Sequence, residues 1–249
     1  MNESTLKKLR QMKMLGMANA FEASLANTQR ENLSCDEFLS VLVDAEHDDR
    51  TNRRIERNIR NARFRYKASI EELYQDVDRN INRSLLSRLA SCTYLEKAES
   101  ILITGSTGIG KSYIASALGN QACVQGYKVF YSNTRRLFTK LKLSKADGSY
   151  LKELSRLEKT DLLILDDFGL QELDAFARNA LMEIIEDRHG KKSIIIVSQL
   201  PVTLWYEIIG EETIADAIMD RIVHDAYRFD LQGESLRKRR KASENNTIV

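Results

Sequence analysis

One short segment of the sequence combines three glycines with a lysine and a serine, and it is the segment best suited to chemistry. It reads GSTGIGKS and matches the Walker A pattern. Glycines let the backbone turn tightly so that amide groups point at phosphate oxygens, the lysine would bind the β- and γ-phosphates, and the serine hydroxyl would ligate Mg²⁺. We therefore predict a site for ATP and Mg²⁺, with the lysine also catalytic, formed by Gly105, Ser106, Thr107, Gly108, Ile109, Gly110, Lys111 and Ser112.

The alternative for this segment is a glycine-rich turn that binds nothing. Its surroundings disfavour that alternative, because an apolar run at 101–104 predicts a buried strand before it and the pattern at 112–121 predicts a helix after it. A phosphate-binding loop requires this strand–loop–helix context.

A second candidate is an apolar run that ends in two aspartates, residues 162–167, LLILDD. Four apolar residues and two aspartates alone are a weak signal, but Asp166 follows Lys111 by 55 residues with one predicted strand between them. The pattern therefore indicates a Walker B strand. We predict that Asp166 holds Mg²⁺, directly or through water, and that Asp167 polarises the attacking water.

The apolar run at 194–197 predicts a further strand, which ends at Ser198 and Gln199. In ATPases of this class that strand lies between the two Walker strands, where a polar residue at its tip can sense the γ-phosphate. We favour Gln199 over Ser198 for this role because its side chain is longer. The alternative is a polar residue that only caps a loop.

Two arginines late in the chain are candidates for phosphate contacts. Arg221 lies in a predicted helix and is a candidate arginine finger, which would reach the γ-phosphate of a neighbouring subunit. The alternative is a surface ion pair with Asp220. Arg237 is a second candidate, for contact with the phosphates of its own subunit.

Two stretches rich in basic residues predict contact with a phosphate backbone. On a helix at about 100° per residue the first set gathers on one side, opposite Ile55, Ile59, Ala62 and Tyr66. The second set follows the predicted strand that ends at Ser132. Solvated helix faces are the alternative for both. The candidate DNA-binding residues are Arg50, Arg53, Arg54, Arg57 and Arg60 in the first stretch, and Arg135, Arg136 and Lys140 in the second.

The secondary structure predicted to position these residues changes near Ser100. Up to about residue 90 the pattern is helical, and Ser34 with Glu37 reads as a capping box before a helix that nothing interrupts until Tyr66. After Ser100, short apolar runs alternate with helical patterns, which predicts a parallel sheet covered by helices on both faces. We predict an α/β fold with two domains: a small all-helical domain at 1–70 for DNA or partner binding, and an ATPase domain at 71–249.

Composition narrows the class of protein. The chain has 249 residues, 43% of them hydrophobic, a formal net charge of +2, and three widely spaced cysteines. Such a chain can form a core, and the cysteines have no metal-binding spacing. No apolar run approaches 18 residues and no signal peptide is evident. We expect a cytoplasmic protein without a membrane partner.

With these segments in view, the α/β part resembles AAA+ P-loop ATPases of the DnaC/DnaA branch, and nearly the full length resembles the IstB family, the ATP-binding helpers of IstA/IstB-type insertion sequences. The resemblance is carried by residues 105–112, by LLILDDFG at 162–169, by SQLP with Trp205 following, and by residues 220–238. One departure is Asp167, where many AAA+ proteins have glutamate. The shorter side chain predicts slow intrinsic hydrolysis that DNA or a partner stimulates.

The resemblance implies an ATP-dependent helper that assembles on target DNA as a homo-oligomeric ring or spiral and recruits a partner transposase, IstA. It implies double-stranded DNA bound with weak sequence specificity, and hydrolysis that releases or remodels the assembly. The nearest alternative is a replicative helicase loader of the DnaC type. A scaffold that binds ATP without turnover, and a P-loop kinase for small molecules, are further alternatives.

Overall fold

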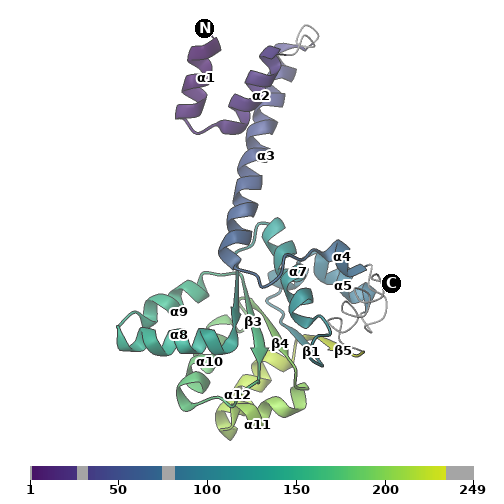
Figure 1. Cartoon of the computed structure of the whole chain (residues 1–249), viewed down its shortest axis with the longest axis vertical. Helices are drawn as coiled ribbons and strands as arrows, with labels where there is room; N and C mark the ends of the chain where they lie inside the picture. The colour runs from purple at the N-terminus through teal and green to yellow at the C-terminus, as the bar shows by residue number, and fades with distance from the viewer. Residues whose placement is uncertain (1, 27–32, 75–81, 234–249) are drawn as a thin grey trace, which may run out of the picture. The chain divides into compact units, whose positions relative to one another are not determined.

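The computed structural model describes residues 2–26, 33–74 and 82–233. The chain divides into two compact units, residues 1–57 and 58–249 (Figure 1). The division falls within helix α3 (Cys35–Ala62). The domain boundary expected at 70/71 stays a prediction, because compactness alone does not show which segment folds independently.

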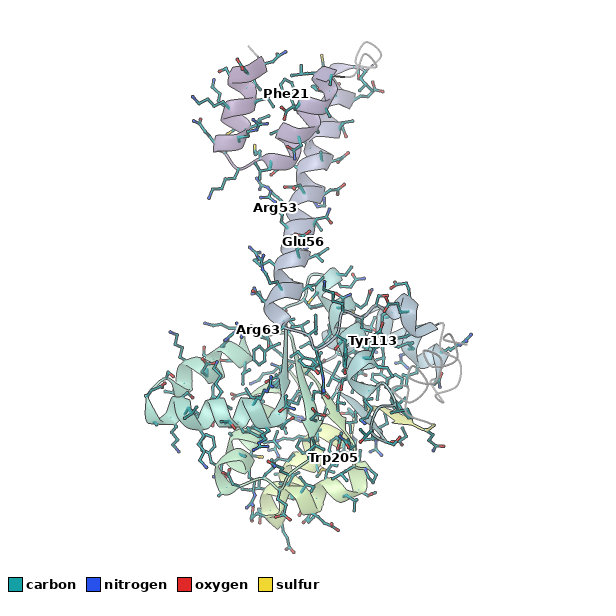
Figure 2. The ribbon with its side chains drawn as sticks, in the orientation of Figure 1. Phe21, Arg53, Glu56, Arg63, Tyr113 and Trp205 are labelled. Carbon is teal, nitrogen blue, oxygen red and sulfur yellow. The ribbon has the colours of Figure 1, made fainter. Side chains whose placement is uncertain are left out.

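The described residues of the N-terminal unit form three helices: α1 (Asn2–Gln11), α2 (Leu15–Ala26) and the first part of α3. Leu9, Ala18 and Phe21 form its small core, of which Figure 2 labels Phe21. The capping box at the start of α3 is confirmed, since Ser34 N donates to Glu37 Oε2 at 2.8 Å and Glu37 N donates to Ser34 Oγ at 3.3 Å. Sequence patterns alone therefore located the beginning of this helix.

The α2 and α3 helices meet at Gly16 with no room for a side chain. A Cβ at this position would lie 2.3 Å from the carbonyl oxygen of Ala45 and 2.7 Å from Cβ of Asp49. Nearby, Met17 N donates to Glu46 Oε2 at 3.2 Å, so a carboxylate of α3 caps the N-terminus of α2. Glycine is therefore required here for close packing and not for an unusual φ angle.

The α3 helix ends at Ala62, four residues before the predicted limit at Tyr66. Arg63 has φ of 58°, in the left-handed region, so it breaks the helical hydrogen-bonding pattern. The chain then crosses helix α7 (Lys111–Val124), where Asn120 Nδ2 donates to the carbonyl of Ala68 at 3.1 Å. The prediction was wrong because no proline or glycine marks this end, and tertiary contacts decide it.

A five-stranded parallel sheet forms the centre of the second unit, in the order β2-β3-β4-β1-β5. The predicted parallel sheet is confirmed, and β4 lies between the strands that carry the two Walker segments. The fifth strand was not predicted, because its alternating burial is the mark of a half-exposed strand and not of an apolar run. The strands are β1 (Ile101–Gly105), β2 (Val129–Asn133), β3 (Leu162–Phe168), β4 (Ser193–Ser198) and β5 (Tyr227–Leu231).

Helices cover both faces of this sheet, because alternate strand residues point to opposite sides. Ile101 and Ile103 of β1 join one apolar cluster, while Leu102 between them joins the other. The first cluster contains residues of α4 (Ile70–Tyr74), α5 (Arg83–Ala90), α6 (Thr93–Glu96) and α7 (Lys111–Val124). The second contains residues of α8 (Thr134–Ala146), α9 (Tyr150–Glu158), α10 (Ala175–Arg188), α11 (Trp205–Ile209) and α12 (Glu212–Val223).

Both faces of the sheet are thus buried, which explains the continuous apolar runs of the central strands. Among the helices at 2–26, 33–74 and 82–233, none is long and apolar enough to cross a membrane.

Candidate nucleotide site

The glycine-rich segment forms the loop between β1 and α7, as predicted. Gly105, Gly108 and Gly110 have φ angles of 142°, 83° and 103°, which other residues adopt only with strain. Gly105 also faces the unpredicted fifth strand, since a Cβ there would lie 2.5 Å from the carbonyl oxygen of Leu231. The loop is therefore shaped both by backbone conformation and by close packing.

Lys111 is buried at the first turn of α7, and its ammonium lies over the loop. Its Nζ donates to the carbonyl oxygens of Gly105 and Ser106, each at 2.8 Å. Burial lowers the pKa of Lys111, and the nearby carboxylates of Asp166 and Asp167 only partly oppose that shift. The site thus holds a poorly solvated cation, which favours an anionic ligand.

Asp166 is 1% exposed and lies at the end of β3. Its Oδ1 accepts a hydrogen bond from Ser112 Oγ at 3.0 Å, and its Oδ2 accepts one from the hydroxyl of Tyr131. Burial raises the pKa of Tyr131, and the negative charge of Asp166 raises it further. The phenol therefore stays protonated and donates to the carboxylate.

The oxygen atoms at this point fit the metal that a P-loop implies. Ser112 Oγ and Asp166 Oδ1 lie together beside the phosphate-binding loop, and Mg²⁺ in nucleotide sites takes one or two protein oxygens with phosphate oxygens and water. Ser112 and Asp166 are therefore the residues that would hold Mg²⁺. When bound, the ion neutralises phosphate charge.

Asp167 adopts φ of 57°, which is unusual for a residue other than glycine. The register between β3 and β4 shifts at the same place, between Leu165 and Phe168. This irregularity turns the aspartate out of the strand, and its Oδ2 accepts hydrogen bonds from Asn133 at 2.9 Å and from Arg65 at 3.1 Å. Local strain at this position is consistent with a functional side chain.

At the tip of β4 the two candidate residues have different surroundings. Ser198 is fully buried and donates to the carbonyl of Phe168 at 2.8 Å. The Gln199 side chain instead accepts a hydrogen bond from Thr107 of the glycine-rich loop, at 2.5 Å. Of the two, only Gln199 reaches that loop, so the preference for Gln199 stands, although a sensing role stays a prediction.

The described contacts of Arg221 are with its own helix, α12, and with α10. It donates to the carbonyl of Ala217 at 2.8 Å and forms an ion pair with Glu186 of α10 at 3.5 Å, with a side chain 27% exposed. The pair with Asp220, considered from the sequence, is not among its described contacts. None of the described contacts of Arg221 is on the glycine-rich loop or the end of β3. Arg237 lies outside the described residues.

The arginines on α3 differ in their ion pairs. Arg50 pairs with Glu46 at 2.6 Å, and Arg53 pairs with Asp49 at 2.5 Å. These acids lie one turn before the arginines, outside the stretch on which the sequence prediction was based. Arg54, Arg57 and Arg60 are exposed and have no ion pair within residues 2–26, 33–74 and 82–233.

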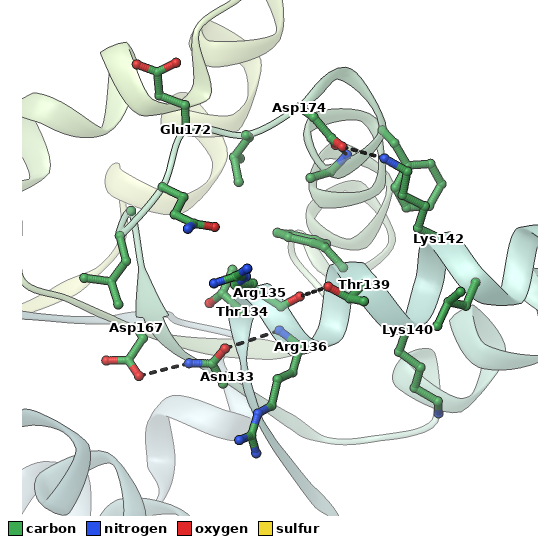
Figure 3. Close-up of a pocket in the computed structure, with 18 of the residues that line it drawn as sticks. Asn133, Thr134, Arg135, Arg136, Thr139, Lys140, Lys142, Asp167, Glu172 and Asp174 are labelled. Atoms are coloured by element: carbon green, nitrogen blue, oxygen red, sulfur yellow. Dashed lines mark hydrogen bonds and ion pairs between the residues drawn. The ribbon is translucent and has the colours of Figure 1, made fainter.

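The second basic stretch lines a groove of about 1190 Å³ beside the end of β3. Figure 3 shows Arg135 and Arg136 at the start of α8, with Asn133 beside Asp167. The side-chain amide of Asn133 links Arg136 to Asp167, since its Oδ1 accepts from Arg136 N at 3.2 Å while its Nδ2 donates to Asp167. Lys140 forms an ion pair with Glu153, and Lys142 pairs with Asp174.

Three residues at the site were not predicted from the sequence: Arg65, Tyr131 and Asn133. Tyr131 and Asn133 occupy β2, and the rule that parallel strands end at one edge of the sheet could have placed Asn133 near Asp167. Arg65 lies 101 residues before Asp166 in the chain. At this separation in the chain no spacing rule predicts the contact.

Comparisons with known proteins find a matching family model and similar sequences. The family model described as IstB-like ATP binding protein matches residues 7–244. The chain is 43% identical over 237 residues to a Sinorhizobium fredii protein whose name describes an insertion-sequence ATP-binding protein, which covers 95% of this chain and 97% of the relative. A similarly named protein of Pseudomonas fluorescens is 41% identical over 202 residues, covering 81% and 87% of the two chains.

Solved structures share the fold at lower identity. The crystal structure of DnaI has a TM-score of 0.58 at 22% identity and covers 67% of this chain and 92% of DnaI. AMPPCP-bound DnaA from Aquifex aeolicus has a TM-score of 0.56 at 21% identity and covers 74% of this chain and 57% of DnaA. At these identities the likeness concerns the fold.

Proposed function

The chain belongs to the family of IstB-like ATP-binding proteins and has the AAA+ fold of DnaI and DnaA, and from this premise we propose that it is an ATP-hydrolysing helper of transposition. The observation that supports this most directly is the contact of Ser112, on the glycine-rich loop, with Asp166 at the end of the neighbouring Walker strand. That contact joins a phosphate-binding loop to a metal-binding carboxylate.

Each residue of the site has a separate role in hydrolysis. Loop amides and Lys111 bind and orient the phosphates, and Ser112 with Asp166 hold Mg²⁺. Asp167 orients the attacking water, and Gln199, which contacts Thr107 of the loop, senses the γ-phosphate. Turnover without DNA is slow because two donors, Asn133 and Arg65, already occupy one oxygen of Asp167.

Binding of double-stranded DNA with weak sequence specificity is the second part of the proposal. Arginine forks suit phosphate, and α3 and α8 present them without a base-reading motif. ATP favours a ring or spiral of subunits on DNA, this assembly recruits the partner transposase IstA in the cytoplasm, and hydrolysis releases it. The names of the relatives, which place them in insertion sequences, support this choice.

Changing Asp167 to asparagine is expected to lower DNA-stimulated ATP turnover by about 10²-fold, because the neutral amide no longer polarises water. Phosphate release with and without duplex DNA measures the effect, while the affinity for ATP should change less than about twofold. Unchanged stimulated turnover would show that Asp167 is not the water-orienting residue. No turnover in the unchanged protein, with or without DNA, would favour an ATP-bound scaffold.

Changing both Arg54 and Arg57 to alanine is expected to weaken DNA binding and to reduce the salt slope by about 2, since each phosphate contact contributes about 0.9. The matched control changes Arg50 and Arg53, which also removes two charges from α3. A smaller loss is expected there, because their acidic partners already neutralise them. Binding measured by fluorescence anisotropy across salt concentrations tests this, and equal slopes in all three proteins would remove these four arginines from the DNA surface.

A helicase loader of the DnaC type is the second candidate, supported by the fold shared with the crystal structure of the DnaC helicase loader, at a TM-score of 0.52 and 20% identity. Affinity capture separates the two candidates. Retention of an IstA-type transposase supports the proposal, whereas retention of a DnaB-type helicase in its place contradicts it.

A further inference from the structure

A single arginine lies between the two carboxylates of the Walker B strand. Arg65 Nη1 is 3.1 Å from Asp167 Oδ2 and 3.4 Å from Asp166 Oδ2. Partial burial disfavours the charged guanidinium, but Tyr66, Asp167 and Asp166 outweigh this, so the pKa of Arg65 lies above its ordinary value. The site therefore contains a permanent positive charge beside the place where Mg²⁺ would bind.

The loop that carries Arg65 is anchored on both sides of it. Phe64 packs edge-on against Tyr131 with ring centres 6.2 Å apart, and a Cβ on Gly119 of α7 would lie 2.5 Å from its ring. Tyr66 packs against Tyr113 of α7, with ring centres 6.0 Å apart. The position of the guanidinium is thus set by the packing of its neighbours, although its own side chain is 42% exposed.

Arg65 and the metal-binding atoms use different oxygens of Asp166. The Oδ1 atom faces Ser112 Oγ, while Oδ2 faces Arg65 and Tyr131. The arginine therefore does not occupy the position where the metal would bind. It neutralises part of the negative charge that would attract the metal, and it repels a divalent cation at close range.

We propose, building on the nucleotide site proposed above, that Arg65 competes with Mg²⁺ for the charge of Asp166 and Asp167 and so sets the Mg²⁺ concentration at which the site loads. Arg65 is a positioning residue in this role, because it acts through the two carboxylates. Arg65 also donates to the oxygen of Asp167 that accepts from Asn133. The residue that controls metal loading therefore also contacts the residue that orients the water.

The test is a Mg²⁺ titration of binding of a fluorescent ATP analogue, mant-ATP, to the full chain. With Arg65→Gln, the half-saturating Mg²⁺ concentration is expected to fall about three- to tenfold, because a repelling charge is removed. Arg65→Lys should change the requirement less than Arg65→Gln does, because it keeps the positive charge beside the carboxylates. Arg63→Gln is the matched control, since it removes one exposed charge from the same loop and Arg63 has no ion pair within the described part of the chain.

Binding of mant-ATP in EDTA separates a metal effect from a direct phosphate contact. It should change less than about twofold in Arg65→Gln, and a large loss there would contradict the proposal. An unchanged or higher Mg²⁺ requirement in Arg65→Gln would also overturn it. Arg65→Met keeps the apolar stem against Tyr66 and provides a second neutral variant if the glutamine variant does not fold. Failure of the unchanged protein to bind mant-ATP at all would instead overturn the proposed nucleotide site.

Discussion

Changing Lys111 to alanine is expected to lower ATP turnover by about 10³-fold, the scale on which loss of one charged donor at a reacting phosphate acts. The lysine is the only buried cation at the glycine-rich loop in the described part of the chain, and its ammonium lies 2.8 Å from two loop carbonyls. Phosphate release measures turnover, and mant-ATP binding is expected to weaken in parallel, because phosphate contact is lost in both states.

The free energy of unfolding provides the control for this variant. Burial lowers the pKa of Lys111, so folding disfavours its charged form, and below the unfolded pKa of about 10.5 that charge does not stabilise the fold. Removal of the ammonium should therefore not lower the melting temperature of the ligand-free protein. A variant that loses turnover together with most of its stability would point to a structural lysine, and full turnover would remove Lys111 from the site.

Changing Arg221 to alanine is expected to lower turnover by about 10³-fold, the lower end of the range for arginine fingers. Within one subunit Arg221 contacts only α10 and α12 among the described residues, so a catalytic role requires the nucleotide of a neighbouring subunit. Binding of ATP to isolated subunits should therefore be unaffected, whereas turnover should depend steeply on protein concentration.

Mixing two inactive proteins tests this arrangement directly. Arg221→Ala supplies an intact Lys111, and Lys111→Ala supplies an intact Arg221, so a mixed assembly contains some interfaces with both residues. Turnover should reappear on mixing, at up to about one quarter of the unchanged rate for random assembly of independent interfaces. No recovery at any ratio, with assembly itself intact by light scattering, would return Arg221 to the surface ion pair with Glu186.

The two variants differ in what a negative result means for the proposed function. Failure of the Lys111 prediction would remove ATP chemistry from the glycine-rich loop. Failure of the Arg221 prediction would leave that chemistry in place and remove only its dependence on a neighbouring subunit. The DNA surface on α3 is independent of both, because its test uses equilibrium binding and salt dependence.

The sequence by itself determined those elements whose conformation depends on residues close together in the chain. The glycine-rich loop, the apolar strand before Asp166 and the capping box at Ser34 all occupy the elements that their patterns predict. Each of these follows from a short-range rule: glycine for positive φ, apolar runs for strands buried on both faces, and a hydroxyl three residues before a glutamate.

Tertiary structure alone decided which distant side chains share the site. Arg65 meets the two aspartates across about 100 residues of chain, β5 closes against Gly105, and α3 ends at Ala62 without a sequence signal. Spacing carries no information about such contacts, because they depend on how helices and strands pack against one another. The sequence therefore predicted a candidate nucleotide site, and packing placed beside it the positive charge that we propose controls its metal.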